Sequence, residues 1–263
     1  MIAITVGAVV IGGIKSIANV TDKLVPFMAG FYVLGALAVL VANASAIPAA
    51  FSAIISGAFT PEGVTGGIIG VIIQGFRRAA FSNEAGIGSA AIAHSAVKTD
   101  RPVTEGYVAL LEPFIDTVVI CTMTALTLVV TGVYSDKALE GVTMTTAAFT
   151  TVTPLFSWVV TVAVVLFAVS TILTWCYYGT KAVGFLTNEN RVAILIFQLF
   201  FLAATVVGAS VNMGAIIDFS DSMIFIMSIP NIIGLYLLAP VVKRELDQYR
   251  TDLRSGAIRS YKA

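Results

Sequence analysis

Long apolar stretches alternate with short polar segments along the chain, and each stretch is close to the length of a membrane helix. An α-helix needs about 20 mostly apolar residues to cross a bilayer. With a window of that length, the pattern predicts seven spans, near residues 1–14, 24–43, 64–97, 104–133, 154–180, 191–209 and 219–240. Polar or turn-rich joints separate them, at residues 15–23, 43–63, 98–101, 135–153, 181–190 and 210–218.

The third span is too long to be one straight membrane helix. Its residues, 64–97, would extend about 50 Å, whereas the hydrocarbon core is about 30 Å thick. A polar segment, Phe81-Ser-Asn-Glu-Ala-Gly86, interrupts it. Unwound backbone at that depth must be buried in protein or line a cavity. The segment therefore predicts a broken helix, the element that forms substrate and ion sites in secondary transporters.

An ordinary helix end, capped by Ser82 or Asn83, is the alternative interpretation of the same segment. It would leave residues 66–74 and 86–97 as two pieces that are each too short to cross the membrane. A broken helix therefore fits the pattern better.

Composition supports a membrane protein. Apolar residues make up 58% of the chain and charged residues 11%, against about 45–50% and about 25% in soluble domains. The formal net charge is zero, so nothing points to a nucleic-acid partner. Cys121 and Cys176 lie in separate apolar stretches and give neither a metal-ligand spacing nor a disulfide framework. We expect the lipid bilayer as a partner and no cofactor.

The orientation follows from the basic residues outside the spans, because Lys and Arg collect on the cytoplasmic side. Lys137 lies alone on one side. Twelve lie on the other: Lys15, Lys23, Lys98, Arg101, Lys181, Arg191, Lys243, Arg244, Arg250, Arg254, Arg259 and Lys262. The C-terminal tail, 241–263, is therefore expected in the cytoplasm, as a short helix or a disordered end.

Several charged residues fall inside the predicted spans. Glu112 and Asp116 are spaced i, i+4 in the fourth span, and Arg77 and Arg78 precede the break in the third. Ionisable groups at this depth usually belong to an ion path or to a buried pair. The two carboxylates are thus candidates for coupling, or for pairing with the arginines to hold the broken helix; both interpretations stay open.

Three further features of the spans have two interpretations each. Ser170 and Thr171 lie at the centre of the fifth span, where hydroxyls either coordinate Na⁺ or bond to their own helix. His94, the only histidine, is expected to pack or to reach the interface rather than to relay protons. Pro230 interrupts the last span beside Asn231, and predicts a kink that is either a hinge or a packing irregularity.

The sequence resembles the alanine-or-glycine:cation symporter family, the sodium:alanine symporters. The resemblance extends to about Pro240 and is carried by these segments: Gly75-Phe-Arg-Arg78, Phe81-Ser-Asn-Glu-Ala-Gly-Ile-Gly88, Pro113-Phe-Ile-Asp-Thr117, Ile120-Cys-Thr-Met-Thr-Ala125, Gly12-Gly-Ile-Lys15, Lys23-Leu-Val-Pro-Phe27 and Ala46-Ile-Pro-Ala-Ala-Phe51.

The resemblance implies an all-α transmembrane protein with the leucine-transporter-type fold of two inverted five-helix repeats, the first helix of each being broken. Residues 1–43 would hold the last two helices of the first repeat, 44–63 an extracellular loop, 64–240 the complete second repeat and 241–263 the cytoplasmic tail. In this fold the paired hydroxyls of the third helix of the repeat bind Na⁺, which favours that role for Ser170 and Thr171.

The implied function is Na⁺-coupled symport of a small neutral amino acid, alanine or glycine, into the cell across the plasma (inner) membrane. It is not an enzyme activity. We expect Ser82, Asn83 and Gly86 to bind the substrate and Ser170 and Thr171 to bind Na⁺. The expected structural or coupling charges are Arg77, Arg78, Glu84, Glu112 and Asp116.

Two rival functions come from other classes. The family's other broken helix would lie before Met1, so the chain is expected to be a C-terminal fragment. A transport-inactive fragment or a non-transporting membrane subunit is therefore an alternative. An intramembrane enzyme using Glu84, Asp116 and His94 is the second, and it lacks both a metal-ligand spacing and a nucleophile beside a base.

Overall fold

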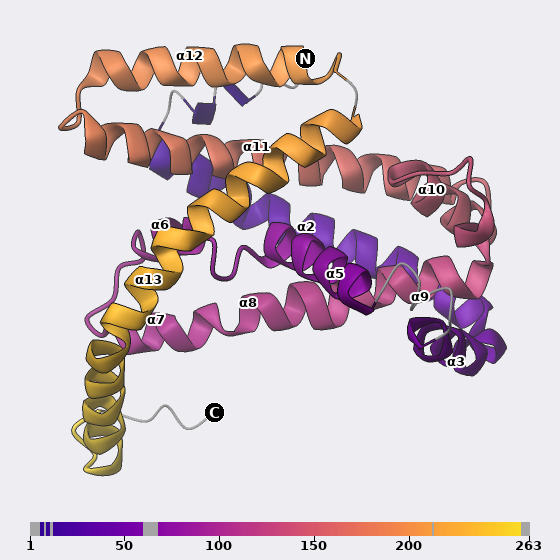
Figure 1. Cartoon of the computed structure of the whole chain (residues 1–263), viewed down its shortest axis with the longest axis horizontal. Helices are drawn as coiled ribbons and strands as arrows, with labels where there is room; N and C mark the ends of the chain where they lie inside the picture. The colour runs from indigo at the N-terminus through magenta and orange to yellow at the C-terminus, as the bar shows by residue number, and fades with distance from the viewer. Residues whose placement is uncertain (1–5, 8, 11–12, 60–67, 212, 259–263) are drawn as a thin grey trace. The chain divides into compact units, whose positions relative to one another are not determined.

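The computed structural model describes residues 6–7, 9–10, 13–59, 68–211 and 213–258. Every regular element within these ranges is helical (Figure 1). The elements are α2 (Gly13–Ala42), η1 (Ala44–Ala46), α3 (Ile47–Ala58), α5 (Ile68–Asn83), α6 (Ser89–His94), α7 (Pro102–Ala109), α8 (Leu111–Pro113), η2 (Phe114–Cys121), α9 (Thr122–Thr131), η3 (Val133–Ser135), α10 (Val142–Thr150), α11 (Phe156–Leu186), α12 (Arg191–Gly208) and α13 (Met213–Arg254).

Five helical stretches in the described part of the chain are long and apolar enough to cross a membrane. They are Val20–Ala42, Pro102–Thr131, Phe156–Leu186, Arg191–Gly208 and Gly214–Arg254. They match the second, fourth, fifth, sixth and seventh predicted spans. The third predicted span is divided between α5 and α6. Most of the first, at residues 1–5, 8, 11 and 12, lies outside the described residues.

Most joints expected from polarity alone contain helix: besides 15–23 and 43–63, the joint 135–153 contains α10, 181–190 the end of α11 and 210–218 the start of α13. Residues 15–23 belong to α2, which runs without interruption from Gly13 to Ala42. Lys15, Asn19, Asp22 and Lys23 are polar, but neither glycine nor proline occurs from Lys15 to Val25, so no residue there breaks the helix. The joint at 43–63 contains α3, a 12-residue helix that begins with a proline in its first turn.

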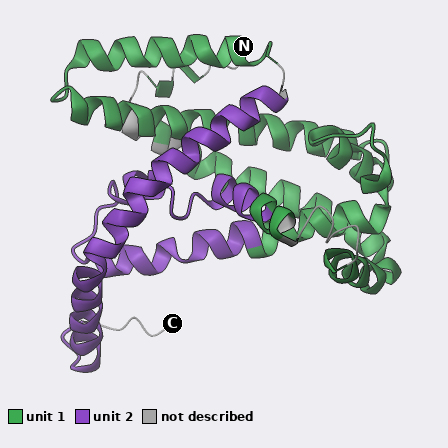
Figure 2. Cartoon of the chain, in the orientation of Figure 1, with its two compact units in different colours: residues 1–74, 118–212 green, residues 75–117, 213–263 purple. Residues whose placement is uncertain are grey.

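The chain forms two compact units that alternate along the sequence (Figure 2). Unit 1 comprises residues 1–74 and 118–212, and unit 2 comprises residues 75–117 and 213–263.

Unit 1 is organised around the contact of α2 with α10 and α11. Its core contains Tyr32, Ala36 and Val39 of α2, Phe149 of α10, and Val160 and Ala163 of α11. Gly35 makes the approach possible, because a Cβ atom there would lie 2.9 Å from side-chain atoms of both Phe149 and Val159. Small residues allow membrane helices to pack closely in this way.

Unit 2 contains the end of α5, then α6, α7, α8 and the first residues of η2, and the long helix α13. At about 1.5 Å per residue, the 42 residues of α13 extend about 63 Å, roughly twice the thickness of a hydrocarbon core. The helix includes the last span and continues through the predicted tail to Arg254. Of the two expectations for the tail, the helical one is correct up to that residue.

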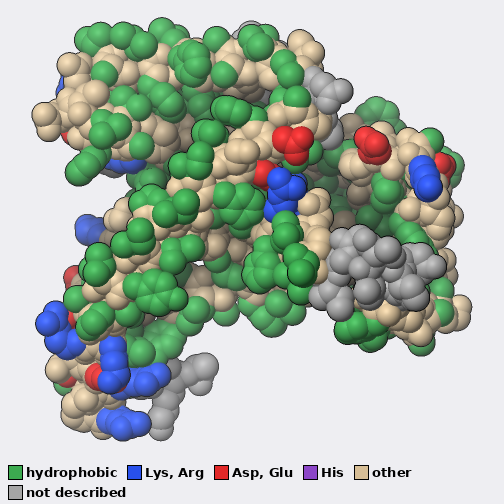
Figure 3. Space-filling view, viewed as in Figure 1, with side chains coloured by type: hydrophobic (Ala, Val, Ile, Leu, Met, Phe, Trp, Pro, Cys, Tyr) green, Lys and Arg blue, Asp and Glu red, His purple; other side chains and the backbone are tan. Residues whose placement is uncertain are grey.

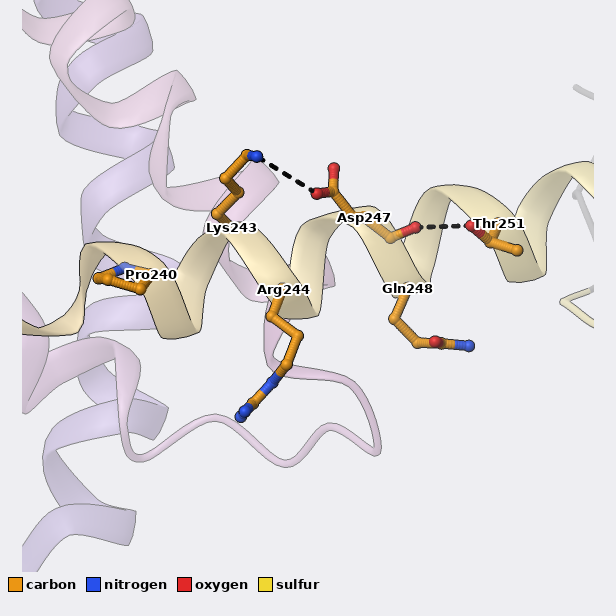
Figure 4. A pocket seen from close by; sticks show the side chains of 6 residues that line it. All are labelled: Pro240, Lys243, Arg244, Asp247, Gln248 and Thr251. Atoms are coloured by element: carbon orange, nitrogen blue, oxygen red, sulfur yellow. Dashed lines mark hydrogen bonds and ion pairs between the residues drawn. The ribbon is translucent and has the colours of Figure 1, made fainter.

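The C-terminal part of α13 is charged. On the face drawn in Figure 3, Lys and Arg side chains gather over this end of the helix. Figure 4 shows a shallow pocket here, lined by residues of α13 alone, in which Lys243 pairs with Asp247 at 4.0 Å. Its side chains are largely exposed, and the pocket contains none of the residues expected to bind substrate.

Candidate functional site

The predicted break in the third span is present, a few residues later than expected. α5 ends at Asn83 and α6 begins at Ser89, so the unwound residues are 84–88. Phe81, Ser82 and Asn83, which we expected to be unwound, form the last turn of α5. Glu84, Gly86 and Gly88 have left-handed backbone, with φ of 56°, 84° and 101°. Such backbone ends a right-handed helix, and glycine adopts it without the steric cost of a Cβ atom.

Polar side chains of α5 meet η2 just before the break. The Ser82 hydroxyl donates to Asp116 Oδ2 at 2.5 Å, and Asn83 Nδ2 donates to Thr117 Oγ1 at 2.8 Å. Thr117 Oγ1 lies 3.3 Å from Asp116 Oδ2. These four residues, all within unit 2, are called the break cluster below. Asn83 Oδ1 also accepts the backbone N–H of Ala85 at 3.0 Å, so its amide already stabilises the unwound backbone.

The local structure of η2 positions the two partners. Its eight residues form a π-helical segment directly after Pro113, and π turns inside α-helices often mark functional sites. Consecutive residues of an α-helix do not share a face. In η2, Asp116 and Thr117 nevertheless both reach the end of α5. We attribute this shared direction to the wider turn.

The unwound residues themselves are held on two sides. The Ser89 hydroxyl donates to Glu84 Oε2 at 2.7 Å, which connects the first unwound residue to the first turn of α6. Asn231 Nδ2, on α13, donates to the Gly86 carbonyl at 2.9 Å. Gly86, an expected substrate residue, thus has its carbonyl engaged by a side chain 145 residues away.

Arg77 and Arg78, before the break, pair with neither Glu112 nor Asp116 but with Asp221. Arg77 Nε lies 3.4 Å from Asp221 Oδ2, and Arg78 Nη2 donates to the same oxygen. Asp221, on α13, is 2% exposed. The suggestion that Glu112 or Asp116 pairs with these arginines is therefore wrong, because the carboxylate of Asp221 already occupies that place. Sequence reasoning missed Asp221, although a carboxylate inside an apolar span was the signal that singled out Asp116.

Glu112 and His94 lie together at the other end of α6. His94 Nδ1 is 2.6 Å from Glu105 Oε1, and its Nε2 is 3.2 Å from Glu112 Oε2. Glu112 and Asp116, although spaced i, i+4, thus have separate partners: Glu112 contacts α6 and Asp116 contacts α5.

The two sodium candidates lie on α11 in unit 1. Ser170 is buried, its hydroxyl donates to the Phe167 carbonyl at 2.9 Å, and its oxygen is 3.8 Å from the Met28 sulfur. Thr171, the next residue, is exposed. The bond of Ser170 to its own helix is the one that membrane helices commonly contain. It uses the hydroxyl proton and leaves oxygen lone pairs available to a ligand.

Several long apolar helices, together with a broken helix whose unwound backbone is bound by polar side chains, are features of membrane transporters. The chain belongs to the sodium:alanine symporter family, and the match extends over residues 1–263. It is therefore a multi-pass membrane protein of a transporter family rather than an enzyme.

Similar proteins include transporters from archaea and bacteria. The sodium/alanine symporter AgcS of Methanococcus maripaludis is 40% identical over 261 residues, which cover 98% of this chain and 57% of the relative. The probable sodium/glutamine symporter GlnT of Bacillus subtilis is 32% identical, with 95% and 52% covered. The amino-acid carrier protein AlsT of Bacillus subtilis is also 32% identical, with 100% and 56% covered. The chain thus spans little more than half the length of these relatives.

Proposed function

We propose that this chain takes part in Na⁺-coupled symport of a small neutral amino acid, alanine or glycine, into the cell. The observation that carries the proposal is the break at residues 84–88 with the break cluster beside it. Left-handed backbone and four clustered polar side chains are costly in a bilayer unless they line a site or a cavity. The names of the relatives, which include sodium/alanine and sodium/glutamine symporters, agree with a zwitterionic substrate.

The substrate side of the proposal assigns Ser82, Asn83 and the backbone at Gly86 to the amino acid. An amino acid offers a carboxylate, which needs donors, and an ammonium group, which needs acceptors. The Asn83 amide can serve either group, and the Ser82 hydroxyl can donate or accept. Both side chains are hydrogen-bonded within the break cluster in this structure, so the substrate would exchange with Asp116 and Thr117 for these contacts.

The ion side assigns Na⁺ to the hydroxyl oxygens of Ser170 and Thr171. Sodium prefers oxygen ligands, and in broken-helix transporters freed carbonyls complete its coordination. Arg77, Arg78, Glu84, Glu112 and Asp116 are the structural or coupling charges. Symport then requires that Na⁺ and substrate favour the same conformation, since coupling is a shared preference of two ligands for one state.

The finer architecture is part of the same proposal. Residues 64–240 would form the second five-helix repeat of a leucine-transporter-type fold with seven membrane helices in this chain. Residues 1–43 would complete the first repeat, 44–63 would face outward, and 241–263 would lie in the cytoplasm beneath the plasma membrane. The hydrogen bond of Arg101 to Asp252 at 2.7 Å supports the last assignment, because it brings the predicted cytoplasmic joint and the tail together within unit 2.

Transport by Ser82→Ala tests the substrate assignment. The variant is made in the product of the complete reading frame that encodes this chain, and uptake of labelled alanine is measured under a Na⁺ gradient. Loss of one hydrogen bond of about 1 kcal/mol should raise KM about fivefold. Ser222→Ala is the control, since its hydroxyl is exposed and bonds only to the Asp218 carbonyl of its own helix. An equal KM in the two variants would contradict the assignment.

A further inference from the structure

Helix α13 contacts the broken helix at two places, one before the break and one within it. Asp221 binds Arg77 and Arg78, which lie in α5 one to two turns before the unwound residues. Asn231 binds Gly86, which lies within them. All five residues belong to unit 2. The two contact points on α13 are ten residues, or about 15 Å, apart along the helix.

The ion pairs of Asp221 with Arg77 and Arg78 fix α5 against α13. Asp221 is buried, and a buried carboxylate is stable only when it is paired and hydrogen-bonded. The two guanidinium groups supply that pairing, and both come from the same turn of α5. α5 therefore cannot slide along α13 without uncovering the Asp221 charge.

The second contact involves both glycines of the unwound segment. Gly86 presents a carbonyl that the interrupted helix leaves without its usual backbone donor, and Asn231 Nδ2 supplies the donor. Gly88 makes room, since a Cβ atom there would lie 3.2 Å from the Asn231 Cβ and 3.3 Å from its Cγ. Ile87, between the two glycines, is buried. The position of the Asn231 side chain thus determines how the segment 86–88 lies against α13.

We propose that Asn231 is a positioning residue for the proposed substrate site, and that α13 acts as a splint that fixes the geometry of the break. The inference rests on the proposed function in taking the amino acid as the ligand, but the splint itself is a statement about the broken helix. Asn231 positions the unwound segment through Gly86 and Gly88. Asp221 fixes the preceding helix, α5, through Arg77 and Arg78. A movement of α13 therefore changes the end of α5 and the unwound residues together.

Hydrogen–deuterium exchange in the 263-residue chain tests the splint without any transport measurement. Asn231→Asp keeps the shape of the side chain but replaces the Nδ2 donor by an oxygen that repels the Gly86 carbonyl. Amides in a peptide covering residues 84–89 should exchange at least about fivefold faster, as expected for one lost hydrogen bond to a backbone group. Ser228→Ala, one turn earlier on α13, is the control, because its hydroxyl bonds to the Phe225 carbonyl of its own helix.

A double-substitution cycle provides a second measurement. Gly88→Ala introduces a Cβ that meets Asn231 and also strains the backbone at φ 101°, so it should speed exchange at residues 84–89 for two reasons, and the cycle isolates the one that involves Asn231. Asn231→Ala removes the contacts with Cγ and Oδ1 and leaves only the Cβ contact at 3.2 Å, so the effect of the two changes together should be smaller than the product of the separate effects. Exchange in a peptide from α11 should stay constant in every variant, which shows that unit 1 remains folded.

The outcomes separate the splint from the transport function. Unchanged exchange at 84–89 in Asn231→Asp, with α11 intact, overturns the splint whatever the transport result. Faster exchange supports the splint, and in the product of the complete reading frame KM for alanine should then rise about tenfold with Vmax little changed, the pattern expected from lost binding. Faster exchange without alanine uptake by any variant, wild type included, contradicts the proposed function and leaves the splint standing.

Discussion

At the scale of single residues, neighbours in the sequence have different surroundings. Ser170 and Thr171 are adjacent on α11, yet Ser170 faces Met28 of α2 inside unit 1 and Thr171 is exposed. The side chains of successive helix residues point in different directions. Ser170 and Thr171 can therefore bind the same ion only if it lies beside the helix, between the two side chains. Thr171 is the more informative position for a test, because its substitution leaves the core of unit 1 unchanged.

We predict that Thr171→Ala raises the Na⁺ concentration for half-maximal alanine uptake, and that Thr171→Ser does so less because it keeps the oxygen. A lost ligand of about 1 to 3 kcal/mol corresponds to about fivefold to 150-fold. Uptake is measured with the product of the complete reading frame. Thr161→Ala, on the same helix with an exposed hydroxyl bonded to the Ser157 carbonyl, should leave the Na⁺ dependence as it is. If the wild type, Thr171→Ala, Thr171→Ser and Thr161→Ala all have the same Na⁺ dependence, Thr171 is not a ligand of the ion.

The break was predictable from the polar residues around it, whereas its contacts with Asp221 and Asn231 were not. The polar residues from Ser82 to Gly86 stand out in an apolar stretch, so one window of sequence is sufficient to locate them. Asp221 binds Arg78, before the break, from 143 residues away, and Asn231 binds Gly86, within it, from 145 residues away. No periodicity or spacing predicts a contact of that range, and the two residues look like isolated polar positions in the last span.

At the scale of helices, close packing in unit 1 depends on one missing side chain. Gly35 is buried between Phe149 of α10 and Val159 of α11. The hydroxyl of Tyr32, three residues earlier, is 2.7 Å from Thr124 Oγ1 of α9. α2 therefore contacts three helices through adjacent positions, and its distance from α10 and α11 is set by glycine.

We predict that Gly35→Ala destabilises the chain relative to Gly30→Ala. Both changes gain the same helix propensity, about 1 kcal/mol in a soluble helix, but Gly30 is exposed and a Cβ atom there meets nothing within 4 Å. The difference between them isolates the overpacking cost of about 1–3 kcal/mol. Thermal unfolding of the 263-residue chain in detergent measures it. Equal unfolding midpoints for the two variants would mean that α10 and α11 accommodate the added methyl group at no cost in stability.

Helix lengths were predictable from hydropathy only in part. The window that locates the spans treats polar residues as ends, so it divided α2 at Lys23 and ended the last span at Pro240, whereas α2 begins at Gly13 and α13 continues to Arg254. Both helices pass through prolines, Pro26 in α2 and Pro230 and Pro240 in α13, so neither polar residues nor proline alone mark their ends. Polarity indicates where the membrane ends, and it does not indicate where the helix ends.

At the scale of the whole molecule, the basic residues predict the orientation. Arg101 and Asp252, from two segments expected on the cytoplasmic side, are hydrogen-bonded at 2.7 Å, and the Tyr107 and Tyr249 rings lie 6.1 Å apart. The Arg101 guanidinium, by hydrogen-bonding the Asp252 carboxylate, lowers the pKa of Asp252. Two segments joined in this way within unit 2 are expected to lie on the same side of the membrane.

We predict that Ser135→Cys is labelled by an impermeant thiol reagent in intact cells, and that Ser255→Cys is labelled only after permeabilisation. Both serines are exposed, and both variants are made in a background in which Cys121 and Cys176 are replaced. The reason is the distribution of twelve basic residues on one side against Lys137 on the other. Labelling of Ser255→Cys in intact cells would reverse the topology.

The last prediction is that the 263-residue chain by itself does not catalyse Na⁺-dependent alanine uptake. Sites of this class are built at the midplane between two repeats, and the proposed architecture gives this chain only the second repeat in full. The three relatives described above are matched over 52 to 57% of their length. Without a facing repeat, Ser82 and Asp116 would retain each other as partners but would have no opposite wall to enclose a substrate.

Liposomes reconstituted with the purified chain provide the measurement. Labelled alanine inside the vesicles is compared under an inward Na⁺ gradient and under an equal K⁺ gradient, with the sodium/alanine symporter AgcS of Methanococcus maripaludis as the positive control. Exchange protection in peptides from α11 establishes that the reconstituted chain is folded. Na⁺-dependent accumulation by the folded chain alone would mean that residues 1–263 contain a complete site, and that the proposed division into repeats is wrong.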